Sequence, residues 1–167
     1  MAPSRLLLLV SSFLLLALSS CKEDPVSSNV GSGTILKATV NGQSFTFPLN
    51  AVSPPSYNAS TKTGTFTGVL TGTPSRTLSI SFTHDIDNGT FPTTLGNPDV
   101  SVTYSEVSGT ASASYSCPIG TSGCSVTLTA TDKSIVDGTF NATLADPNDT
   151  TKQVSITAGS FSVKLNR

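Results

Sequence analysis

The sequence has no tryptophan and a single histidine, and charged residues make up only 11% of its 167 residues. An average soluble domain has about 25% charged residues. Nine Lys or Arg stand against ten Asp or Glu, which gives a net charge of −1. This balance provides no basic patch, so we expect no nucleic-acid partner. The absence of tryptophan removes the largest flat side chain on which a sugar ring could stack.

Long hydrophobic runs are also missing, since a helix needs about 20 apolar residues to cross a bilayer. The run from Leu6 to Leu18 is shorter, follows the single positive charge of Arg5, and ends in small residues. This order is typical of a secretory signal peptide. We therefore predict that residues 1–20 are a signal peptide rather than a membrane-spanning helix.

The end of that segment, Leu18-Ser19-Ser20-Cys21, is similar to the lipobox of bacterial lipoproteins, in which an aliphatic residue and two small residues precede a cysteine. The resemblance implies cleavage before Cys21, a diacylglycerol thioether on its sulfur and acylation of its amine. Two or three acyl chains would hold the protein firmly at a membrane, because each buried methylene contributes roughly 0.8 kcal/mol. An ordinary signal peptide with a chance cysteine is the alternative.

The residues after Cys21 bear on its location. Lys22-Glu23-Asp24 resembles the surface-export signal of some Bacteroidota lipoproteins, although a charged start to a solvated tether explains the same residues. No aspartate directly follows Cys21, so the inner-membrane retention signal of enterobacterial lipoproteins is missing. We expect a lipid anchor in the outer membrane of the cell envelope, facing either the periplasm or the cell surface. The polar residues 21–33 are predicted to be the lipidated N-terminus and a flexible tether.

Two further cysteines, Cys117 and Cys124, are seven positions apart. An envelope location favours a disulfide between them, which would contribute about 2–3 kcal/mol by closing a short loop. A zinc site would need two more ligands, and the only histidine, His84, is far away in the sequence. A catalytic dithiol is more often Cys-x-x-Cys.

Alternation with a period of two dominates residues 34–167, where apolar residues alternate with Ser and Thr in six stretches: 78–82, 100–104, 111–115, 126–130, 154–158 and 161–165. Turn residues separate such stretches, at Pro54-Pro55, Gly72-Thr73-Pro74, Asn88-Gly89, Asn97-Pro98, Asp137-Gly138 and Asp146-Pro147-Asn148. The pattern predicts an all-β single domain, an antiparallel β-sandwich or barrel-like fold of roughly eight to ten short strands.

A Gly-Thr-Phe-x-x-x-Leu motif recurs, starting at Gly64, Gly89 and Gly138, with a near copy at Gly159. We interpret it as a packing motif rather than a binding repeat. In this interpretation the glycine closes a turn or bulge at positive φ, while Phe and Leu face the core.

The segments Ala38-Thr39-Val40-Asn41-Gly42, Asp137 to Phe140 and Val154 to Phe161 resemble the opening and the closing strands of small Bacteroidota envelope lipoproteins of unknown function. The resemblance implies a β-sandwich-like domain in the cell envelope. It brings no catalytic residues, because none are established for such domains.

Candidates for chemistry are few. His84-Asp85 lacks the Gly-x-Ser-x-Gly elbow of a hydrolase, so we predict no catalytic residue and no enzyme. Asp85 and Asp87 are spaced like half of a calcium loop, but the downstream glutamate of an EF-hand is missing and a turn explains the same residues. We predict no metal site and no cofactor.

Tyr57, which could be exposed in the loop after Pro54-Pro55, joins Asp85 and Asp87 as a candidate ligand loop. Tyr104 and Tyr115 continue apolar faces and are expected in the core or at its edge.

These observations leave two functional hypotheses. The first is a non-enzymatic structural or interaction module, held at the membrane through the lipid on Cys21 and contacting other envelope proteins. The second is a surface module that binds a glycan or another exposed polymer, with Tyr57 at its site.

Overall fold

The computed structural model describes residues 34–118, 122–132 and 134–167. Cys21, the predicted signal peptide and the predicted tether lie outside these residues. The described residues form eleven strands and no helix, and the strands are β1 (Thr34–Val40), β2 (Gln43–Thr46), β3 (Ser56–Asn58), β4 (Thr63–Leu70), β5 (Ser75–Thr83), β6 (Thr93–Gly96), β7 (Val100–Ser108), β8 (Ala111–Ser116), β9 (Cys124–Thr131), β10 (Ile135–Asp146) and β11 (Asp149–Lys164).

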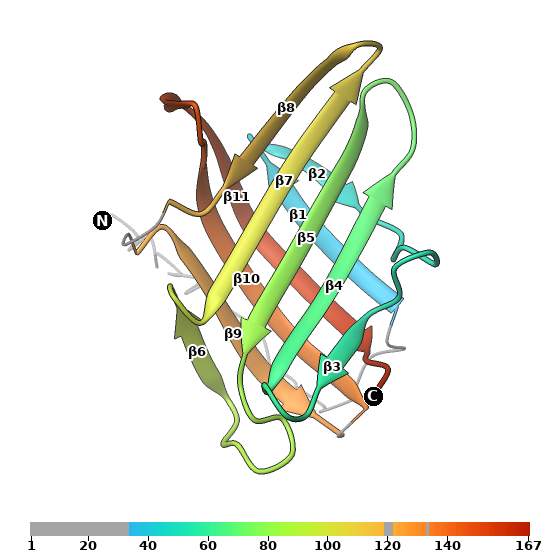
Figure 1. The fold of residues 1–167 in the computed structure, drawn as a ribbon, viewed down its shortest axis with the longest axis vertical. Helices are drawn as coiled ribbons and strands as arrows, with labels where there is room; N and C mark the ends of the chain where they lie inside the picture. Colours follow the sequence, from blue (N-terminus) through green and yellow to red (C-terminus); the bar gives the residue numbers. More distant parts are fainter. Residues whose placement is uncertain (1–33, 119–121, 133) are drawn as a thin grey trace, which may run out of the picture.

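The strands form one open antiparallel sheet in the order β2-β1-β11-β10-β8-β7-β5-β4-β3, while β9 pairs with β10 and β6 pairs with β9. In Figure 1, β4, β5, β7 and β8 (the front layer) lie in front of β1, β10 and β11 (the back layer). The sheet therefore curls over itself. The turn between the layers falls where Ser116 of β8 pairs with Ala145 of β10.

Contacts between strands that are distant in the sheet order hold the curled sheet together. The ring centroid of Phe66 on β4 lies 4.9 Å from that of Phe161 on β11. Leu49, which follows β2, forms an isolated β-bridge with Gly68 of β4. The buried apolar residues of both layers accordingly belong to one cluster.

The expected all-β single domain with antiparallel strands is confirmed. The expected number of strands is wrong, because β2, β3 and β6 contain only four, three and four residues and are too short to show an alternating pattern. All eleven strands belong to one large open sheet.

The prediction of separate strands at 154–158 and 161–165 is also wrong, because β11 contains 154–158 and continues without a break through 161–164. The alternation changes phase at Ala158, where φ is +48° and the register against β10 shifts. The side-chain oxygen of Asn141 accepts a hydrogen bond from the Ala158 backbone N–H at 3.2 Å. A β-bulge of this kind bends a strand without ending it.

Two glycines of the recurring motif, Gly138 and Gly159, have a different role from the one predicted, and none of the four motif glycines has a positive φ. Gly138 lies inside β10 rather than in a turn, so the turn expected at Asp137-Gly138 is wrong. It pairs with Phe161 across β10 and β11, and Phe140 pairs with Gly159 in the same ladder. The glycines leave space for these rings, since a β-carbon at Gly159 would lie 2.6 Å from Cδ1 of Phe140.

The predicted disulfide between Cys117 and Cys124 is confirmed, with the two α-carbons 6.0 Å apart. Cys124 begins β9 and is buried, and Cys117 follows β8. The disulfide therefore joins the end of one strand to the start of the next at the point where the sheet passes from the front layer to the back layer.

Replacing Gly138 with alanine should destabilise the domain. The added β-carbon would lie 2.5 Å from the carbonyl oxygen of Thr127 and would meet the ring of Phe161. Relieving this overlap requires a shift of backbone and ring, which typically costs 1–3 kcal/mol. We expect a loss of about that size in the free energy of unfolding, measured by urea denaturation followed by circular dichroism.

The matched control is Gly96→Ala. A β-carbon at Gly96 would have the Cys124 carbonyl oxygen 3.9 Å away, an ordinary contact. The control should leave the stability unchanged or raise it by about 0.4–1 kcal/mol, because alanine restricts the unfolded chain more than glycine does. Equal effects at Gly138 and Gly96 would contradict the role given to the Gly138–Phe161 pair.

Candidate functional site

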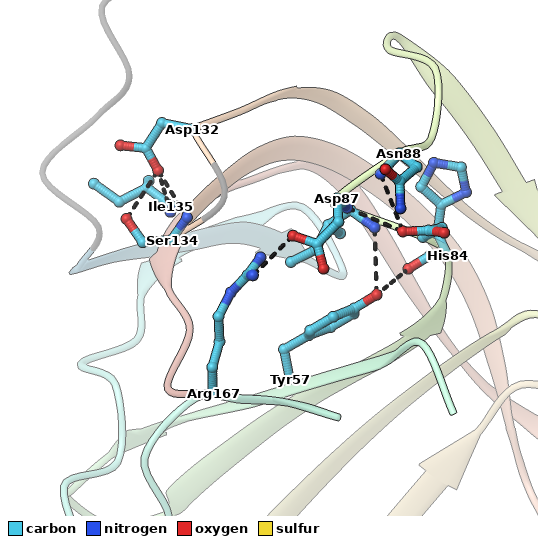
Figure 2. A network of polar contacts seen from close by, with 10 residues as sticks. Tyr57, His84, Asp87, Asn88, Asp132, Ser134, Ile135 and Arg167 are labelled. Carbon is cyan, nitrogen blue, oxygen red and sulfur yellow. Dashed lines mark hydrogen bonds and ion pairs between the residues drawn. The ribbon is translucent and has the colours of Figure 1, made fainter. Parts of the chain in front are cut away.

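A polar cluster lies where the chain leaves β5. The segment that follows β5 contains His84, Asp85 and Asp87, and it packs over Tyr57 of β3 (Figure 2). The structure therefore brings together the three residues predicted as a ligand loop, although 27 positions separate Tyr57 from His84.

Tyr57 holds this segment from the core side. Its side chain points inwards and is only 5% exposed. The hydroxyl donates a hydrogen bond to the His84 carbonyl oxygen at 3.1 Å and accepts one from the Ile86 N–H at 3.3 Å. The expectation that Tyr57 is exposed in a loop is wrong, because it occupies the inward position of a short strand.

Asp85 organises the turn and pairs with a lysine of the β3–β4 hairpin. Its Oδ2 lies 2.5 Å from Nζ of Lys62, and its Oδ1 accepts hydrogen bonds from the backbone N–H groups of Asp87 and Asn88, at 3.1 Å each. The hydrogen bond from Lys62, followed by that from Asn88, lowers the pKa of Asp85 from 3.8 to about 2. The spacing that resembles half a calcium loop is thus occupied by a turn and an ion pair.

Asp87 pairs with Arg167, which the sequence analysis did not identify. The Arg167 Nη1 lies 2.8 Å from Oδ1 of Asp87, and its guanidinium carbon lies 5.5 Å from the ring centroid of Tyr57. Two backbone hydrogen bonds set its place, from the Tyr57 N–H to the Asn166 oxygen at 2.7 Å and from the Asn166 N–H to the Pro55 oxygen at 2.9 Å. Only the folded chain brings residues 57, 87 and 167 together, so no local pattern could have revealed this contact.

His84 is next to Asp85 in the chain, but the two side chains have different partners. Its ring meets the Phe91 ring edge-on, with centroids 5.4 Å apart. Its Nε2 is buried beside Gly89 and has no hydrogen-bond partner among the described residues. The Asp85 carboxylate is turned to Lys62, so the pair does not form the arrangement in which a carboxylate orients a histidine for catalysis.

An open groove of about 700 Å³ lies on the outer side of this cluster. Tyr57 forms part of its wall, and its polar groups come from Ser56, Asn58, Thr61, Thr63, Thr65 and Arg167. Hydroxyl, amide and guanidinium groups can donate and accept hydrogen bonds, so the groove suits a polar ligand rather than an apolar one.

A second polar cluster lies on the inner side of the front layer. The Arg76 Nε donates to Oε1 of Glu106 at 2.9 Å, the Tyr104 hydroxyl donates to the same oxygen, and the guanidinium lies 4.7 Å from the Phe45 ring centroid. Burial, together with the neighbouring Glu106 carboxylate, raises the pKa of Tyr104. Tyr104 and Tyr115 stack with their centroids 6.4 Å apart, which confirms their prediction as core or core-edge residues.

No protein family, curated protein or solved structure matches this chain. Within the described residues, no group of three or more His, Cys, Asp or Glu side chains is placed to hold a metal ion. Nor does the described part of the chain contain a helix long and apolar enough to cross a membrane. The resemblance to small Bacteroidota lipoproteins stays a prediction, and the function is argued from the sequence and the geometry.

The contact between Lys62 and Asp85 can be tested by titration. In Lys62→Met, the pKa of Asp85 should rise from about 2 towards 3.8, because the largest cause of its lowering is removed. Because the folded-state pKa is depressed, the stability that Asp85 contributes is present above pH 3.8 and is lost as the pH falls through about 2. Carboxyl chemical shifts in NMR spectra measure the change, and an unchanged pKa would contradict the ion pair.

Proposed function

We propose that this protein is a bacterial lipoprotein, anchored in the outer membrane through lipid on Cys21, whose β-domain acts as a non-enzymatic structural or interaction module. The observation that carries the proposal is the order of Arg5, the apolar run that follows it and Leu18-Ser19-Ser20-Cys21. This order combines a signal peptide with a lipidation motif. The polar residues 22–33 would then act as a spacer between lipid and domain.

Two features of the folded domain support the proposal. The Cys117–Cys124 disulfide suits a protein that folds in the oxidising cell envelope. The charged side chains at both polar clusters pair with one another, as in Lys62–Asp85, Arg76–Glu106 and Arg167–Asp87. Because these charges bind one another, they are engaged within the domain rather than presented to a substrate, which fits a non-enzymatic module.

Replacing Cys21 with serine should abolish lipidation, since the acceptor sulfur is removed. Wild-type protein expressed in a diderm bacterium should incorporate a labelled fatty acid and sediment with the outer-membrane fraction. We expect Cys21→Ser to lose the label and the membrane association together, measured by fluorography and immunoblotting of fractions. A serine variant that remained membrane-bound would contradict the anchor.

The matched control is the double variant Cys117→Ser, Cys124→Ser. It also removes cysteine sulfurs, but it leaves Cys21 in place, so it should keep the label and the membrane location. It should lose about 2–3 kcal/mol in the free energy of unfolding, because the unfolded chain is no longer closed into a short loop.

The groove beside Tyr57 favours a second function, a surface module for a glycan or another exposed polymer. Arg167 lies in its wall among residues that carry hydroxyl and amide groups, while Tyr57, whose side chain is buried, supports the wall from the core side. Sugars present many hydroxyl groups, and Arg167 adds donors in a fixed planar arrangement.

An array of soluble oligosaccharides tests this second function. The wild-type domain should bind at least one oligosaccharide, and Arg167→Gln should weaken that binding about tenfold, the effect of losing a hydrogen bond from a charged group. Lys164→Gln, which removes an exposed positive charge outside the groove, should bind like the wild type. An array that stays blank with and without calcium would rule out the groove as a glycan site.

A further inference from the structure

The outward side chains of the front layer form a surface of unusual composition. We call it the hydroxyl face and define it by the outward positions of residues 65–69, 77–81, 101–107 and 112–116. Every one of these positions holds Ser or Thr except Val69 and Val107. The inward positions of the same strands hold the core residues, so the alternation separates an apolar side from a hydroxyl-bearing side.

The hydroxyl face carries no charge. The four strands of the front layer contain two charged residues, Arg76 and Glu106, and both occupy inward positions. There they pair with each other at 2.9 Å. About 25–35% of the residues on an ordinary soluble surface are charged, whereas here even the available charges are directed to the other side of the layer.

The hydroxyl groups are aligned in rows across the strands. One row runs from Thr67 through Ser79 and Thr103 to Ser116, which are successive partners in the sheet register. The hydroxyl oxygens of Thr67 and Ser79 lie 2.7 Å apart. Strand geometry spaces the residues that bear these groups by about 4.8 Å within a row and by about 6.7 Å along a strand, while hydroxyls that bond each other, as those of Thr67 and Ser79 do, lie closer. A row of this kind presents hydroxyl donors and acceptors repeatedly along one line of the surface.

We propose that the hydroxyl face is a docking surface for a neutral, hydroxyl-rich polysaccharide. A surface without charge attracts neither polyanions nor polycations, while each Ser or Thr hydroxyl both donates and accepts hydrogen bonds, as sugar hydroxyls do. The proposal deepens the second function above, and the face extends to the groove, because Thr65 belongs to both. A second copy of the chain is a poorer occupant, since the core of a homodimer interface is about 65% apolar and this face offers only Val69 and Val107.

The test is retention of the folded domain on insoluble polymers: microcrystalline cellulose, chitin and starch granules. Wild-type protein should be retained by at least one of them, equally at low and high salt, because no charge takes part. The variant Thr67→Val, Thr103→Val removes two hydroxyls of one row and keeps the β-branched shape. We expect retention to fall about tenfold, as the loss of two hydrogen bonds predicts.

The matched control is Thr139→Val, Thr143→Val, which makes the same chemical change at two exposed positions of β10 in the back layer. It should be retained like the wild type. Retention on none of the polymers, equal losses in both variants, or retention abolished by salt would each overturn the proposal. So would a stable dimer in solution that Thr103→Lys dissociates, because the face would then be occupied by a second copy.

The groove and the hydroxyl face can fail separately. Arg167 lies outside the hydroxyl face, so Arg167→Gln should not change retention on the insoluble polymers. If Arg167→Gln abolishes polymer retention while Thr67→Val, Thr103→Val keeps it, glycan binding stands and the hydroxyl face is excluded as its surface.

Discussion

In the core, two phenylalanine rings each lie over a glycine of the neighbouring strand, Phe161 over Gly138 and Phe140 over Gly159. A slip of one residue between β10 and β11 would put each ring against a side chain instead of a glycine and would turn the core residues to the solvent. The two pairs therefore set the register of the longest ladder in the described sheet. In this register, the ring of Phe161 packs against the ring of Phe66 on β4, and this contact joins the back layer to the front layer.

The position of the front layer then determines where charge can lie. With the inward positions of β5 and β7 facing the core, Arg76 and Glu106 meet across the ladder and compensate each other there. The outward positions are left to hydroxyl groups. At the other polar cluster, Lys62 and Arg167 hold the segment after β5 through Asp85 and Asp87. The domain thus presents a neutral face and a polar groove on a scaffold whose clustered charges are paired.

Much of the fold could be predicted because strand alternation is a local property. The residues around Leu78 and Val102 show their buried side directly in the sequence, and Cys117 and Cys124 are close enough in the chain to suggest their disulfide. The errors fall where a residue serves a distant partner. Gly138 resembles a turn residue in the sequence, but it leaves space for the ring of Phe161. At Ala158 the alternation of apolar and polar residues changes phase, which suggested the end of a strand, whereas the strand continues through a bulge.

By itself, the sequence determined the all-β class of the domain and its disulfide, because each depends on residues adjacent or nearly adjacent in the chain. The lipid anchor at Cys21 is a proposal that the sequence alone carries. It also brought Tyr57, Asp85 and Asp87 forward as candidates. Only the tertiary structure decided that Tyr57 is buried beneath the other two and that Arg167 completes the cluster. The physical reason is that the register of the sheet pairs strands that are far apart in the sequence. An alternating pattern shows which side of the sheet a residue occupies, but it does not show which residue it contacts.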